Sequence, residues 1–144
     1  MIQLVVAVGV VAATVAVGLV LRGRQRAEVP TQPTFEAPAQ LDRSDFPASG
    51  APWLVAVFSS ATCTTCADVV RKAEVLRSRD VDVVDVEYGA AGDLHRKYSI
   101  DGVPIVVVAD ADGVVRKHFV GPVTATDLWA AYADARSAGG TQGA

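Results

Sequence analysis

The chain has 144 residues, a length that corresponds to a single domain. Hydrophobic residues make up 51% of it, and 16 acidic residues outnumber 13 basic ones. Three of the basic residues directly follow the first apolar segment, so the rest of the chain carries 10 basic against 16 acidic residues. This negative charge argues against nucleic acid as a partner, because binding phosphates requires a basic face.

An apolar segment opens the chain, and residues 2–21 include no charged side chain. As a helix with a rise of about 1.5 Å per residue, this segment would span roughly 30 Å, the thickness of the hydrocarbon core of a bilayer. The alternative is a secretory signal peptide, but such a peptide carries a basic residue ahead of a shorter apolar core. We therefore predict a retained transmembrane anchor over residues 1–22.

The orientation of this anchor follows from the charges beside it. Arg22, Arg24 and Arg26 come after the span, and no basic side chain comes before it. Positive charge beside a membrane span tends to stay in the cytoplasm. The sequence thus predicts a single-pass protein of the cell membrane, attached through residues 2–21, with its domain on the cytoplasmic side. An extracytoplasmic domain is the alternative.

A proline-rich segment comes next. Pro30, Pro33 and Pro38 occur among few large apolar residues, and proline fixes φ and donates no backbone hydrogen bond. We predict a linker over residues 23–50 without a core of its own, containing one short helical turn before Pro47. The folded domain is expected over residues 51–137, and the Gly-rich end, 138–144, is expected to be disordered.

The domain alternates between strand and helix patterns. Continuous apolar runs predict buried strands, and apolar residues spaced three and four apart predict amphipathic helices. Gly113 is expected to supply a positive φ in a turn. In chain order, the predictions are a strand at 53–59, a helix within 62–79, a strand at 81–87, a short helix at 91–100, strands at 104–110 and 114–121, and a helix at 124–138. This order fits an α/β or α+β fold with a central mixed sheet.

The only two cysteines, Cys63 and Cys66, are separated by two residues. Attachment of a c-type haem needs a histidine after the second cysteine, where Ala67 stands. A zinc site usually needs four ligands, and the chain adds only His95 and His118, which we interpret as solvated. A structural disulfide closing so small a loop would hardly constrain the unfolded chain. The pattern therefore favours redox chemistry, with no metal and no cofactor beyond a redox-active disulfide.

The position of the pair also suits redox chemistry. Cys63 falls at the junction of a buried strand and a helix, where free N–H groups and the helix dipole stabilise a thiolate. The thiolate is the species that attacks in disulfide exchange. Cys66 lies one turn further along, near the buried face, where it can resolve a mixed disulfide.

A proline precedes a later buried strand. The bond to Pro104 could be cis, as in a tight turn, or trans, the commoner state of a proline that opens a strand. Together, "FSSATCTTC", "KYSIDGVPI", the hairpin "VVVADADGVVRKHFVG" and the last helix make the chain resemble the thioredoxin superfamily over about residues 50–136.

This resemblance implies a thioredoxin-like α/β fold, in which helices flank a central mixed sheet. It implies that Cys63 is the nucleophile and Cys66 the resolving thiol. It also implies that Pro104 is a cis-proline facing the disulfide, and that Val103 offers backbone groups to a bound substrate strand.

The chain departs from the family pattern around the cysteines. Thr62 replaces a tryptophan that helps to shape the substrate surface, and Thr64 and Thr65 replace the Gly-Pro dipeptide that influences the reduction potential. Val57 replaces a buried aspartate that assists deprotonation of the resolving thiol. Two carboxylates of the neighbouring strand, Asp85 and Glu87, are candidates to act instead.

The function predicted from these features is that of a membrane-tethered thiol–disulfide oxidoreductase. It would exchange disulfides with protein substrates through Cys63 and Cys66, and an unidentified redox partner would supply or remove electrons. The alternative is a thioredoxin-like binding or redox-sensing module with weak exchange activity. Trp53 and Trp129 are interpreted as packing residues.

Overall fold

The computed structural model describes residues 35–47 and 49–140. The predicted anchor at 1–22 and the first part of the predicted linker lie outside the described residues. Within the described ranges, no helix is both long and apolar enough to span a bilayer. The compact unit to which these residues belong begins at Phe35.

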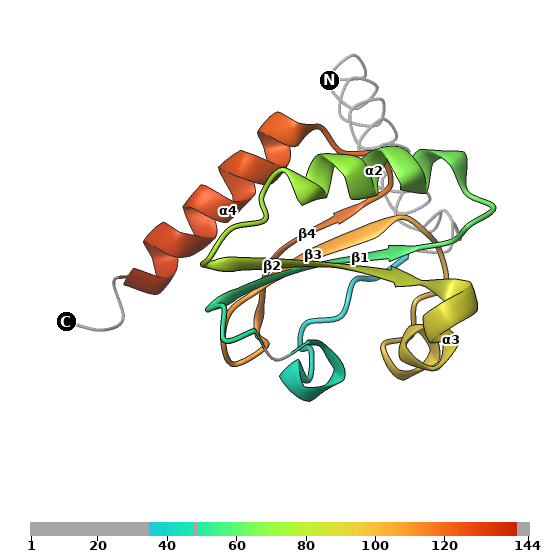
Figure 1. Ribbon diagram of the computed structural model, residues 1–144, viewed down its shortest axis with the longest axis horizontal. Helices are drawn as coiled ribbons and strands as arrows, with labels where there is room; N and C mark the ends of the chain where they lie inside the picture. Colours follow the sequence, from blue (N-terminus) through green and yellow to red (C-terminus); the bar gives the residue numbers. More distant parts are fainter. Residues whose placement is uncertain (1–34, 48, 141–144) are drawn as a thin grey trace, which may run out of the picture. The chain divides into compact units, whose positions relative to one another are not determined.

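The described elements follow the predicted order (Figure 1). They are η1 (Arg43–Asp45), β1 (Trp53–Ser59), α2 (Thr64–Glu74), β2 (Val81–Glu87), α3 (Tyr88–Lys97), β3 (Ile105–Ala109), β4 (Val115–Val120) and α4 (Ala125–Gly140). The predicted succession β-α-β-α-β-β-α is confirmed. Helix α3 begins earlier than predicted because Glu87 caps it, accepting a hydrogen bond from the Ala90 N–H.

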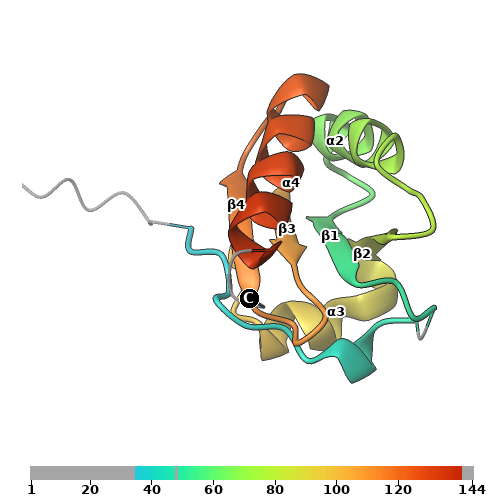
Figure 2. The ribbon, with the colours of Figure 1, turned by 90° about the vertical axis from the view of Figure 1, so that its left-hand side faces the viewer.

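The four strands form one mixed sheet in the order β2-β1-β3-β4. Strand β1 runs parallel to β2 and antiparallel to β3, and β4 is antiparallel to β3. Helices α2 and α4 cover one face of this sheet, and α3 lies on the other face (Figures 1 and 2). The predicted α/β architecture, a central mixed sheet flanked by helices, is therefore confirmed.

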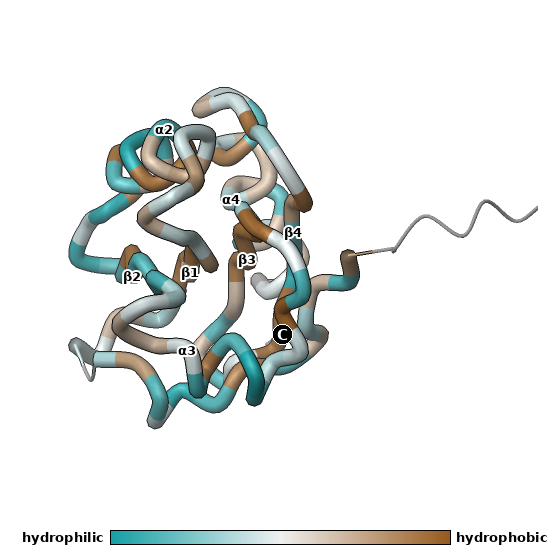
Figure 3. The backbone as a smooth tube through the Cα atoms, turned by 90° about the vertical axis from the view of Figure 1, so that its right-hand side faces the viewer, coloured by the Kyte–Doolittle hydropathy of each residue, from teal (hydrophilic) through white to brown (hydrophobic). Residues whose placement is uncertain are grey.

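Strand β1 is buried because both of its faces are covered. Val55 and Val57 point into the core beneath α2 and α4, whereas Leu54, Ala56 and Phe58 point into the core on the α3 side. Alternate side chains of a strand point to opposite faces, so a strand covered on both sides is apolar throughout. Figure 3 shows this apolar character as brown stretches on β1 and β3, the two central strands.

Part of the predicted linker belongs to the domain, which corrects the boundary at residue 51. Leu41 and Phe46 are only 1% and 6% exposed and join the core on the α3 side. The Leu41 N–H donates to the Gly113 carbonyl at 2.8 Å. The Tyr98 hydroxyl donates to Asp45 in η1. The predicted helical turn before Pro47 is confirmed, but the apolar side chains beside it bury themselves against distant parts of the chain.

Gly113 is needed where this segment meets the β3–β4 turn. Its φ is +79°, as the turn prediction expected, and a Cβ there would lie 2.0 Å from the backbone carbonyl oxygen of Leu41. A side chain would therefore meet both a steric clash and the left-handed backbone region that L-residues avoid. Glycine permits the close approach that docks Leu41 in the core.

Two other predictions need correction. Residues 138–140, predicted to belong to a disordered tail, form the end of helix α4, and 141–144 lie outside the described residues. His95 is not solvated: it is 2% exposed, and its Nε2 lies 2.7 Å from the Val86 carbonyl oxygen, to which it donates. Its ring packs edge-on against Phe58 and Tyr88, which the position of α3 under the sheet makes possible. His118 is exposed on β4, as predicted.

Candidate active site

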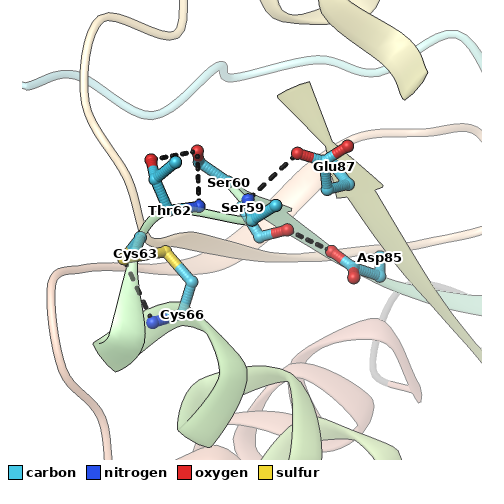
Figure 4. The surroundings of a disulfide bond; sticks show 8 residues. Ser59, Ser60, Thr62, Cys63, Cys66, Asp85 and Glu87 are labelled. Atoms are coloured by element: carbon cyan, nitrogen blue, oxygen red, sulfur yellow. Dashed lines mark hydrogen bonds between the residues drawn. A yellow bond between two sulfur atoms is a disulfide. The ribbon is translucent and has the colours of Figure 1, made fainter. Parts of the chain in front are cut away.

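Cys63 and Cys66 form a disulfide where β1 leads into α2, and their Cα atoms are 5.3 Å apart (Figure 4). Cys63 is the N-cap of α2, and its Sγ accepts a hydrogen bond from the Cys66 N–H at 3.1 Å. The first N–H groups of a helix have no partner within the helix and carry partial positive charge. A negative charge on the Cys63 sulfur would therefore be stabilised here.

The two cysteines differ in accessibility. Cys66, in the first turn of α2, is 1% exposed, whereas Cys63 is half-buried. A substrate sulfur can approach Cys63 from solvent, whereas the buried Cys66 cannot be approached by a substrate from solvent. This asymmetry suits a pair in which one thiol attacks a partner and the other closes the disulfide afterwards.

A cavity of about 300 Å³ opens beside the disulfide. Its walls come from the carboxyl ends of the parallel strands β1 and β2, from the loop after β1, and from the first turns of α2. The lining residues are Ser59, Ser60, Ala61, Cys63, Cys66, Ala67, Val70, Asp85 and Glu87. Both sulfur-bearing residues and both predicted carboxylates thus share one cavity.

The parallel register of β1 and β2 brings the carboxylates to the cysteines. Val57 pairs with Asp85 and Ser59 with Glu87, so Ser59, Asp85 and Glu87 all project from the face that carries α2. Ser59 is 3% exposed, and its hydroxyl donates to Oδ1 of Asp85 (Figure 4). The sequence did not single out Ser59. Its signal was a hydroxyl at the end of an otherwise apolar strand, directly before the cysteine loop.

Glu87 ties the cysteine loop to α3. Its Oε1 accepts from the Ala61 N–H at 3.0 Å, and its Oε2 accepts from the Ala90 N–H at 3.0 Å. Hydrogen bonds from the backbone N–H groups of Gly89 and Ala61 to the carboxylate hold the pKa of Glu87 below its ordinary value. The carboxylate is therefore charged at neutral pH and fixes the residue two positions before Cys63.

This contact gives a pH-dependent prediction. Because folding lowers the pKa of Glu87, its contribution to stability is complete above the ordinary glutamate pKa of about 4.3 and is lost as the pH falls through the lower folded value. We expect the urea midpoint of Glu87→Gln to lie below that of the wild type at pH 7, and the gap to close towards pH 3. Glu36→Gln, at an exposed glutamate, is the matched control. A difference in urea midpoint between Glu87→Gln and the wild type that stays constant at all pH values would contradict the assignment.

The threonines around the cysteines lie at the surface. Thr62, Thr64 and Thr65 are all exposed, and the Thr62 hydroxyl lies 3.1 Å from that of Ser60. Thr64 and Thr65 begin α2 between the two cysteines. Their predicted roles, in substrate contact for Thr62 and in adjusting the reduction potential for the other two, stay predictions.

The Val103–Pro104 peptide bond is cis, as the resemblance implied. Ile105 pairs with Phe58, so continuing this antiparallel register places Pro104 opposite Ser59, at the end of β1 where the cysteine loop begins. The Pro104 carbonyl accepts a hydrogen bond from the Gly121 N–H at 2.8 Å. The cavity beside the disulfide does not include Val103 or Pro104 among its lining residues.

In the described part of the chain, no three or more His, Cys, Asp or Glu side chains form a group that could hold a metal ion.

Comparisons with known proteins found similarity in structure only. No family model matches the sequence, and no curated protein matches it. A solved structure described as that of a malarial protein aligns with a TM-score of 0.53 and 18% identity, over 57% of this chain and 94% of that one. This likeness shows a shared fold.

Two solved thioredoxins also align. A mutant thioredoxin from Halobacterium salinarum NRC-1 has a TM-score of 0.48 and 26% identity, over 56% of this chain and 71% of that one. The thioredoxin of Fasciola hepatica has a TM-score of 0.48 and 24% identity, over 56% of this chain and 77% of that one.

Proposed function

We propose that this chain, whose described domain has a thioredoxin-like fold, is an oxidoreductase that exchanges disulfides with protein substrates through Cys63 and Cys66. The observation that carries the proposal is the disulfide itself. It lies at the N-terminus of α2, with one cysteine half-buried, the other buried, and a cavity beside both.

The exchange proceeds in two steps. In the reduced protein, the Cys63 thiolate attacks one sulfur of a substrate disulfide; a bond forms between Cys63 and that sulfur, and the other substrate sulfur leaves as a thiolate and takes up a proton. The Cys66 thiol then loses its proton, and its sulfur attacks Cys63. The Cys63–Cys66 disulfide closes, and the second substrate sulfur leaves. Two electrons have passed to the substrate, and a dithiol partner must return them.

The neighbouring groups have roles in this proposal. The free N–H groups at the start of α2 stabilise the Cys63 thiolate. The backbone of Val103 beside Pro104 pairs with an extended substrate segment, in the manner of an added strand, and Thr62 contacts the same segment. The hydroxyls of Thr64 and Thr65 lie in the first turn of α2, where they can donate to a thiolate.

Insulin reduction tests the proposal. The full chain should accelerate the dithiothreitol-driven reduction of insulin, followed as the turbidity of the precipitating B chain. The rate should rise in proportion to the protein concentration. If turbidity develops no faster than with dithiothreitol alone, the chain is instead a binding or redox-sensing module whose disulfide exchanges too slowly to serve as a catalyst.

We further propose that residues 2–21 anchor the protein in the cell membrane, with the domain on the cytoplasmic side. The support is the uncharged length of this segment and the three arginines that follow it. Alkaline phosphatase fused to the C-terminus should then be inactive and remain in the membrane fraction. An active fusion in that fraction would place the domain outside the cytoplasm.

A further inference from the structure

The cavity beside the disulfide has two chemically different walls. Ala67 and Val70 of α2 line one part of it, and the carboxylates of Asp85 and Glu87 line another. Its lining includes no basic side chain. An apolar wall that leads to fixed negative charge is complementary to the side chain of Lys or Arg, which has an apolar stem and a cationic end.

The carboxylates are held in place by contacts within the domain. Both oxygens of Glu87 accept backbone N–H groups, from Ala61 and Ala90. Oδ1 of Asp85 accepts from the Ser59 hydroxyl, and within the described residues its Oδ2 has no hydrogen-bond or ion-pair partner. Asp85 is itself exposed. It can therefore bind a cation without first breaking an internal ion pair.

A substrate bound through Cys63 would supply an occupant for this cavity. When a substrate is joined to Cys63, the residues flanking its cysteine must lie close to the cavity, because Cys63 lines it. We infer that the cavity selects polypeptides that carry Lys or Arg beside the reactive cysteine. This inference rests on the proposed function and names its substrate class. An acidic flanking residue would meet like charge and be disfavoured.

The charges of Asp85 and Glu87 should also affect the rate of disulfide exchange. A Cys63 thiolate that forms near two carboxylates is opposed by like charge, although the start of α2 favours it. The other titratable group in the cavity lining is Cys66. A cation from the substrate offsets the carboxylates when the thiolate attacks. The preference should therefore appear in the rate constant for exchange as well as in binding.

Peptides with one internal disulfide test the inference. They differ only in the residue next to the attacked cysteine, which is Lys, Gln or Glu, and the measurement is the second-order rate constant of their reduction by the reduced full chain. We expect the Lys peptide to react about fivefold faster than the Gln peptide, the upper end of the effect of one solvent-exposed ion pair, and the Glu peptide to react more slowly. This ratio should shrink between about 0.01 M and about 1 M salt, where the Debye length falls from about 30 Å to about 3 Å.

Two variants that each remove one negative charge test whether the preference for Lys depends on Asp85. Asp85→Asn should bring the Lys-to-Gln ratio close to one. Asp93→Asn should leave it unchanged, because Asp93 is an exposed residue of α3, on the opposite face of the sheet. Equal rates for the Lys and Gln peptides, or a ratio that survives in Asp85→Asn, would overturn the inference while leaving disulfide exchange established.

A binding measurement separates this inference from the proposed function. The oxidised full chain is titrated with the same peptides carrying Ser in place of Cys, and the backbone amide shifts of Ala61 and Asp85 are followed by NMR. The Lys peptide should move them in the wild type and not in Asp85→Asn. If no disulfide peptide is reduced, the proposed function fails and these shifts still decide whether the cavity takes a cation. Equal shifts with the Lys and Gln peptides would refute it.

Discussion

Replacing Cys63 with alanine should abolish disulfide exchange, whereas replacing Cys66 with alanine should trap substrates as mixed disulfides. Cys63 is the half-buried N-cap of α2, and Cys66, in the first turn of this helix, is 1% exposed. Without Cys63 no sulfur is placed to attack a substrate. Without Cys66 the first attack proceeds, but nothing inside the domain resolves the product.

The two variants differ in what they accumulate. After thiols are blocked in extracts, non-reducing electrophoresis should show adducts of higher mass for Cys66→Ala that disappear with dithiothreitol, and none for Cys63→Ala. In the reduced wild type, iodoacetamide should label Cys63 before Cys66. Ser60→Ala, in the same loop, is the control and should form no stable adducts. Adducts formed by Cys63→Ala instead would reverse the assignment of attacking and resolving thiols.

Truncating Leu41 to alanine should cost about 2–5 kcal/mol of the free energy of unfolding, the range for a large buried aliphatic side chain. Leu41 is 1% exposed and packs in the core on the α3 side, with its N–H bonded to Gly113. Urea denaturation followed by circular dichroism measures the loss as a lower midpoint with an unchanged slope.

The control for this prediction is an exposed aliphatic residue. Val75 is 60% exposed, so Val75→Ala should change the free energy of unfolding by no more than about 0.5 kcal/mol. If Leu41→Ala were equally mild, the segment before β1 would contribute no core and would behave as the linker that its prolines suggested.

The sequence by itself determined the order of strands and helices and the position of the cysteine pair. Apolar runs and three-to-four spacing are local signals, and they placed β1 and β3 within one residue of their observed bounds and α2 inside the predicted stretch. Cys63 falls where the strand pattern changes to the helix pattern, so its position at a helix N-terminus could also be predicted from the sequence. The bond to Pro104 was anticipated as cis through the resemblance of its surrounding motif, not through periodicity.

Only the tertiary structure decided which distant residues meet. Asp85 and Glu87 reach the cysteine cavity because β2 pairs with β1 in one particular parallel register, and a shift by one residue would turn both carboxylates to the α3 face. Leu41 is buried because its backbone binds to Gly113 in the β3–β4 turn, and His95 is buried because α3 packs under the sheet. Local periodicity predicts the secondary structure of a single segment. Register and docking depend on free energy shared between segments far apart in the chain, which no single stretch of sequence displays.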